Sequence, residues 1–213
     1  MVVLYISYMS KAVACQQLPL PRGRPRSFDM ASALDRAVMV FREHGFDGAS
    51  IDALKEATGL TAGSLYKAFK DKKHIFAAAF ARYVAERQSG LAVRLAGATT
   101  GRERIVETLR FYLDAASGVE GRQGCLVLAS LIEASTLDDA LRASLGETLA
   151  ANRGTLVTML RQGQQDGSVR ADLPVEPCAD LLLSLFQGLR AVGKLHDPVD
   201  RDALLALALK IID

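Results

Sequence analysis

The chain has 213 residues, of which 50% are hydrophobic, and a formal net charge of +2. This composition excludes a disordered chain and allows one large domain, or a small domain attached to a larger one. The charge is uneven, because residues 1–73 carry 11 Lys and Arg against 7 Asp and Glu, whereas residues 74–213 carry 15 against 17. The basic N-terminal third therefore indicates a polyanionic partner at that end.

Residues 1–26 are predicted to form an extension followed by a basic arm. The apolar run 1–20 is too short to cross a bilayer, and its first charge, Lys11, follows the apolar residues. We therefore expect neither a signal peptide nor membrane association; a start codon placed too early, with Met9 next, is the alternative. Prolines within Pro21-Arg-Gly-Arg-Pro-Arg26 exclude a helix there.

Residues 27–72 are predicted to be a helix-turn-helix domain. A first helix starts at Ser27 and ends near Gly45, and two short helices follow it. Ser50 and Thr61 each offer a side-chain oxygen to the N–H groups of a helix start, and Gly59 permits the sharp turn between them. So short a connection makes the two helices cross steeply and directs the second one, about residues 62–69, outward.

Residues 73–213 are predicted to form a larger helical domain. Asp71 caps a long amphipathic helix, and five more helices follow, with Gly118 to Gly124 among the connections between them. No segment alternates as a strand does, so the fold class is all-α with about nine helices. Asp197 and Pro198 are predicted to be the N-cap and first turn of the last helix.

The last two helices are unusually apolar, which predicts that they pair with a second copy of the chain. The alternative is that this hairpin is buried inside one subunit. The residues expected at the dimer interface are Leu181, Leu182, Leu185, Phe186, Leu189, Leu204, Leu205 and Leu207.

Four N-terminal segments resemble the TetR/AcrR family of transcriptional regulators. They are Phe41-Arg-Glu-His-Gly-Phe46, Ala57-Thr-Gly-Leu-Thr61, Gly63-Ser-Leu-Tyr-Lys-Ala-Phe69 and Asp71-Lys-Lys-His-Ile-Phe76, and the resemblance covers about residues 27–76 closely. Later segments, among them Gly124-Cys-Leu-Val-Leu128, are similar to parts of the family's ligand-binding bodies. The resemblance implies a nine-helix subunit in which three helices bind DNA, a fourth links head to body, and the body holds a small-molecule pocket and a dimerising bundle.

The resemblance also implies a set of DNA contacts. Small residues at the start of the recognition helix are expected at base edges, Tyr66 and Lys72 at phosphates, and the arginine arm in a minor groove. Lys55 stands where a small residue is usual between the two helices, and Ala68 replaces a side chain that often reaches phosphate. The predicted DNA-binding residues are Arg22, Arg24, Arg26, Ser50, Thr61, Ala62, Gly63, Ser64, Tyr66, Lys67 and Lys72.

The effector pocket is expected among helices four to seven, and the alternative for its candidate residues is plain hydrophobic core. With no cluster of charged residues in view, the effector is predicted to be largely apolar. Cys125 also invites a redox-sensor hypothesis, because it opens an apolar helix. The candidate lining residues are Phe80, Tyr83, Phe111, Tyr112, Leu126, Leu131 and Met159.

Together these features predict a ligand-responsive repressor that binds a near-palindromic operator as a homodimer. The three cysteines, Cys15, Cys125 and Cys178, lie far apart and outside any metal-ligand spacing, which favours a reducing cytoplasm and no cofactor. Neither a nucleophile pattern nor a phosphate-binding loop is present in the sequence, so catalysis is not expected. A helical protein-binding adaptor with non-specific DNA binding is the alternative function.

Overall fold

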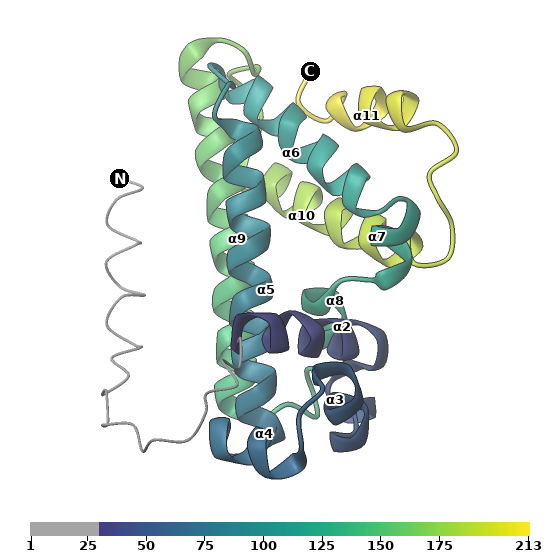
Figure 1. Cartoon of the computed structure of the whole chain (residues 1–213). Helices are drawn as coiled ribbons and strands as arrows, with labels where there is room; N and C mark the ends of the chain where they lie inside the picture. Colours follow the sequence, from purple (N-terminus) through teal and green to yellow (C-terminus); the bar gives the residue numbers. More distant parts are fainter. Residues whose placement is uncertain (1–29) are drawn as a thin grey trace.

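The computed structural model describes residues 30–213, and over this range it contains helices and no strand. A head of three short helices, α2 (Met30–Gly48), α3 (Ile51–Thr58) and α4 (Ala62–Ala68), lies at one end (Figure 1). The long helix α5 (Lys72–Leu95) runs from this head along the body. The body is completed by α6 (Gly101–Ala115), α7 (Gly118–Gln123), α8 (Leu126–Ile132), α9 (Asp139–Asp166), α10 (Val175–Val192) and α11 (Arg201–Leu209).

The helices of the head begin where the sequence predicts. The Ser50 hydroxyl accepts a hydrogen bond from the Ala53 amide at 3.0 Å, and the Thr61 hydroxyl accepts one from the Ser64 amide at 3.1 Å. Gly59 ends α3 in the left-handed conformation, with φ of 70°. These local interactions confirm the predicted caps and the tight turn, and they set the direction in which α4 leaves the head.

Two hydrophobic cores hold the fold together. The first fills the head around Phe41 and Phe76, whose rings meet edge to face at 5.0 Å, and continues into the body as far as Leu145 of α9. The second lies among α6, α9, α10 and α11, with Phe186 at its centre and stacked on Tyr112 at 4.2 Å. Because the first core crosses from head to body, the two parts pack as neighbours without a solvated linker.

The all-α prediction of about nine helices is confirmed, but two local predictions are wrong. The connection Gly118 to Gly124 is itself a short helix, α7, so residues 30–213 contain ten helices by the bounds given above. The last helix begins at Arg201 with Asp200 as its N-cap, whereas the Asp197 carboxylate accepts from the Gly118 amide at 2.7 Å. A contact distant in sequence therefore takes the side chain that had been assigned to the local cap. Within residues 30–213, the helices lack the combination of length and apolarity that crossing a membrane requires.

The residues predicted for a dimer interface divide between the core and the surface. Leu182, Phe186 and Leu205 are buried in the second core of the same subunit, which corrects their assignment to the interface and follows the alternative interpretation for these three. Leu181 and Leu207 are 53% and 59% exposed. Residues four apart, such as 182 and 186, share one helix face, and here that face points inward. Leu185, Leu189 and Leu204 lie between these extremes, half-buried against the same core.

The close crossing of α6 and α9 gives a test of this packing. A Cβ atom added at Gly101 would lie 2.1 Å from the backbone nitrogen of Gly163, so we expect Gly101→Ala to lower the free energy of unfolding by about 1–3 kcal/mol. Gly146→Ala in α9 is the matched control, because nothing lies within 4 Å of its added Cβ, and it should raise stability by about 0.5–1 kcal/mol. Urea unfolding at equal protein concentration measures both changes, and equal effects of the two substitutions would contradict this account of the crossing.

Candidate functional site

Helix α4 presents a small polar and basic surface to solvent. Its one fully buried side chain, Leu65, is 1% exposed and packs into the first core. On the other faces Gly63, Ser64 and Lys67 are exposed, and Tyr66 is 47% exposed. Thr61 is also exposed at the start of the helix, and Ala62 is half-buried. The predicted recognition residues on α4 are thus held on a protruding helix by a single apolar anchor.

Other predicted DNA contacts have different surroundings. Ser50 is exposed, and its hydroxyl is already used as the α3 cap. Lys55, which raised a packing question, turns along its own helix to pair with Asp52 at 2.7 Å. Arg22, Arg24 and Arg26 lie outside the described residues.

Lys72 takes a role that differs from the predicted phosphate contact. Its ammonium donates to the carbonyl oxygens of Phe46 at 2.8 Å and Ala49 at 3.1 Å, and it lies 4.7 Å from the centre of the Phe46 ring. The connection between α2 and α3 is therefore held to the start of α5 by a lysine that satisfies otherwise unpaired carbonyls. This corrects the assignment of the Lys72 side chain, whose donors are engaged within the protein.

Head and body meet at a cluster of buried arginines. Arg42 of α2 is 6% exposed, and its guanidinium donates to the Gly124 carbonyl at 2.7 Å and to the Glu120 carboxylate at 2.8 Å. Arg190 of α10, which is 1% exposed, donates to the same Gly124 carbonyl at 2.6 Å. Glu120 also lies 3.9 Å from Arg87 of α5. One carbonyl and one carboxylate thus join the head helix to two helices of the body.

A second contact across the same junction uses Glu133, just after α8. Its carboxylate accepts from the backbone amides of Phe46 at 2.6 Å and Asp47 at 3.3 Å. Gly45 permits this approach, because its φ is 71° and an added Cβ would lie 2.3 Å from the Glu133 carboxylate. The end of α2 is therefore held by the body at two points.

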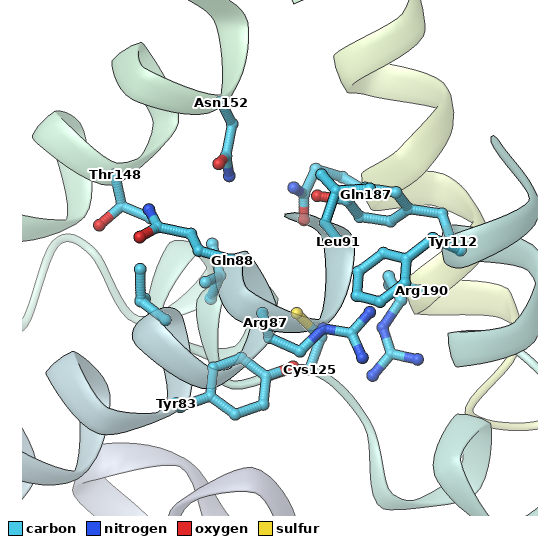
Figure 2. Close-up of a pocket in the computed structure, with 13 residues that line it drawn as sticks. Tyr83, Arg87, Gln88, Leu91, Tyr112, Cys125, Thr148, Asn152, Gln187 and Arg190 are labelled. Atoms are coloured by element: carbon cyan, nitrogen blue, oxygen red, sulfur yellow. The ribbon is translucent and has the colours of Figure 1, made fainter. Parts of the chain in front are cut away.

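A cavity lies beside this junction, enclosed by α5, α6, α9 and α10 (Figure 2). Its empty volume is about 530 Å³, counting space at its mouth, which lies in the range of small-molecule sites. It adjoins a wider chamber of about 1810 Å³, also counting open solvent, and the two share Leu91 and Tyr112. Besides apolar side chains, the inner cavity is lined by Arg87, Gln88, Cys125, Thr148, Asn152, Gln187 and Arg190.

Three of the seven predicted pocket residues, Tyr83, Phe111 and Tyr112, lie on the wall of this cavity. The other four are core side chains, which corrects their placement. Phe80, Leu126 and Leu131 belong to the first core, and Met159 belongs to the second. Helical spacing identifies them as apolar and inward-facing but does not separate a packed face from a cavity wall.

The arginines that meet at Gly124 were missed by sequence reasoning. A signal was available, since Arg42 follows Val40 and Phe41 on an otherwise apolar helix face, and Arg190 lies in a leucine-rich helix. A charged residue in such a position indicates a buried partner, because burial of an unpaired charge is costly. The predicted absence of charged groups around the pocket is therefore wrong for Arg87 and Arg190.

Cys125 lies on the cavity wall with a half-buried side chain, and Cys178 is buried in the second core. Both thiols are free, and they belong to different parts of the body. The redox hypothesis for Cys125 stays a prediction.

The comparisons with known proteins agree with this geometry. Residues 33–79 match the model of the bacterial regulatory proteins of the tetR family, and residues 101–208 match the model of the tetracyclin repressor-like C-terminal domain. The chain is 30% identical to the HTH-type transcriptional repressor ComR of Escherichia coli over 79% of its length and 80% of the relative. It is 26% identical to the HTH-type transcriptional repressor DhaR of Mycobacterium sp., over 73% and 77% of the two chains.

A solved structure extends the comparison. A cysteine mutant of the TetR family transcriptional regulator CifR, complexed with 26-base-pair double-strand operator DNA, is similar with a TM-score of 0.75 and 34% identity. The alignment covers 89% of this chain and 98% of that one. The head with its protruding α4 and the helical body with its cavity define a helix-turn-helix transcriptional regulator. The chain belongs to the TetR family.

The clamp formed by Lys72 can be tested by Lys72→Met, which keeps the stem beside Phe46 and removes the ammonium. We expect the free energy of unfolding to fall by about 1–2 kcal/mol, because the carbonyls lose a charged donor at a partly exposed site. Lys70→Met, at an exposed lysine, is the control and should change stability by less than about 0.5 kcal/mol. Thermal and urea unfolding measure both. Unchanged stability of Lys72→Met with weakened DNA binding would restore the phosphate assignment.

Proposed function

We propose that this protein is a repressor that binds a near-palindromic operator as a homodimer and leaves it when a small molecule fills the cavity beside Gly124. The observation that carries the proposal is the connection between an exposed, singly anchored α4 and that cavity through one continuous core and the Arg42 cluster. A recognition surface and a ligand site so joined can influence each other.

The DNA-binding step rests on the exposed face of α4. The N-terminal residues of a recognition helix contact base edges in the major groove, and in a dimer the two helices fit half-sites about 34–36 Å apart. Small residues at Gly63 and Ser64 allow close backbone approach, while Tyr66 and Lys67 extend toward phosphates. Exposed leucines on α10 and α11, Leu181 and Leu207, are the described part of the proposed dimer surface.

The release step follows from linkage. A ligand that binds better to one arrangement of the body shifts the population toward it, with a typical coupling of about 1–3 kcal/mol between the two sites. Helix α5 is common to both sites, because its first residue, Lys72, holds the head while Tyr83 and Arg87 line the cavity. A displacement of α5 therefore changes the spacing of the two heads in a dimer.

The relatives support repression as the direction of control. ComR and DhaR are both named repressors, and the structure of CifR contains operator DNA. Action on DNA also places the protein in the cytoplasm, with regulation in place of catalysis as its role. A protein-binding adaptor remains the second candidate, carried only by the exposed apolar side chains of α10 and α11.

One experiment separates the two. Genomic fragments bound by the purified full chain would be selected and sequenced, and the affinity for the best fragment compared with that for random DNA at fixed salt. A repressor gives an affinity ratio of about 10³ or more, and the sites contain an inverted repeat. A ratio near one would overturn the proposal and favour the adaptor.

Lys67→Ala tests the role of α4 directly. We expect operator affinity to fall about tenfold, and the slope of log affinity against log salt to fall by about 1 for each subunit, if the ammonium neutralises a phosphate. The control is Lys210→Ala, because Lys210 is exposed just after α11, at the far end of the body from the head. Fluorescence anisotropy with labelled operator at several salt concentrations measures both, and equal curves for the two variants would exclude Lys67 from the interface.

A further inference from the structure

Polar atoms without partners converge on the inner cavity. Among the described residues, the Tyr83 hydroxyl, one terminal nitrogen of Arg190 (Nη1) and the Gln187 amide oxygen are buried and lack a hydrogen-bond partner. All three side chains line the cavity, and Tyr83 and Arg190 are only 4% and 1% exposed. Figure 2 shows the Tyr83 hydroxyl and the guanidinium groups of Arg87 and Arg190 gathered around Cys125. Buried donors left unpaired cost free energy, and a ligand acceptor would relieve that cost.

The electrostatics of the cavity select the charge of this ligand. Three guanidinium groups, on Arg42, Arg87 and Arg190, share the single Glu120 carboxylate, at 2.8, 3.9 and 3.7 Å respectively. The described lining of the inner cavity adds no Asp or Glu to balance them. Burial and the neighbouring Cys125 thiol raise the pKa of Tyr83, so its phenol stays protonated and acts as a donor. The cavity therefore has an excess of positive charge and of donors.

The apolar walls select the rest of the ligand. Phe111, Tyr112 and Leu91 line the inner cavity, and the adjoining chamber continues along Leu95, Leu156 and Phe186. A ligand with an anionic end at Arg190 and an apolar body would follow this path. Inorganic anions would leave the apolar walls without contacts.

We propose that the cavity binds an organic carboxylate whose oxygens accept from Arg190 Nη1 and the Tyr83 hydroxyl, with an aliphatic or aromatic body against Phe111 and Tyr112. This inference rests on the proposed function, because it names the chemical class of the effector. A planar carboxylate fits a guanidinium through paired donors, and the low dielectric of the cavity strengthens the interaction.

The same geometry connects the ligand to the head. The second terminal nitrogen of Arg190, Nη2, donates to the Gly124 carbonyl, which also accepts from Arg42 of α2. A carboxylate on Arg190 competes with Gly124 and Glu120 for this guanidinium. Occupation of the cavity thereby redistributes the hydrogen bonds that hold α2 to the body.

The test compares charged ligands with neutral ligands of the same shape. Straight-chain carboxylates from butanoate to decanoate, and phenylacetate, are titrated into the full chain by calorimetry, beside their primary amides and inorganic phosphate. We expect at least one carboxylate to bind at least about tenfold more tightly than its amide, as a charge-assisted hydrogen bond predicts. Binding of every amide as tightly as its acid, of phosphate as tightly as the best carboxylate, or of no carboxylate at all would overturn the proposal.

Tyr83→Phe then tests the geometry without endangering the fold, because the hydroxyl that it removes has no partner among residues 30–213. Carboxylate affinity should fall about tenfold while thermal stability is kept or raised. Arg110→Gln, at an exposed arginine on α6 paired with Glu107, is the control and should leave affinity unchanged. Equal carboxylate affinity in wild-type protein and Tyr83→Phe would exclude the proposed hydrogen bond.

These measurements separate this inference from the proposed function. Calorimetry contains no DNA, so carboxylate binding is established or excluded whatever the DNA result. Selective DNA binding without carboxylate binding overturns only the effector class. Carboxylate binding without selective DNA binding overturns the repressor and leaves the ligand site.

Discussion

The architecture depends on one backbone oxygen, the Gly124 carbonyl, which accepts hydrogen bonds from two buried arginines that belong to different parts of the molecule. Arg42 comes from the head and Arg190 from the body, and neither cation could be buried at such low exposure without this acceptor and Glu120. Gly124 itself has φ of 80°, which a glycine adopts without strain. The junction is therefore specific in geometry as well as in charge.

A shared hydrophobic core makes this junction part of a larger unit. Phe41 of α2, Phe76 of α5 and Leu126 of α8 belong to one cluster, so head and body have no independent packing at this boundary. Packed interiors do not deform continuously, and a change at the cavity is transmitted as a small displacement of whole helices. Helix α5 is best placed for this, because it contributes to the head, the junction and the cavity.

The cavity combines two properties that pull in different directions. Its aromatic and aliphatic walls exclude water, which raises the cost of every buried charge, while Arg87 and Arg190 are retained there with only Glu120 nearby. Such an excess of unpaired donors is unfavourable in the empty protein. It becomes favourable when an anion arrives, so the strain in the network is a reason for selective and state-dependent binding.

The sequence by itself determined the features that depend on near neighbours. The caps at Ser50 and Thr61, the turn at Gly59 and the buried anchor Leu65 follow from interactions within four residues, and so did the all-α class and the exposed α4. Tertiary structure alone decided where Lys72 and Asp197 donate or accept, which leucines of α10 lie inward, and that Arg42, Arg87 and Arg190 meet at one carboxylate. Those contacts join residues up to 82 positions apart, and periodicity along one helix holds no information about which distant carbonyl or carboxylate will face it.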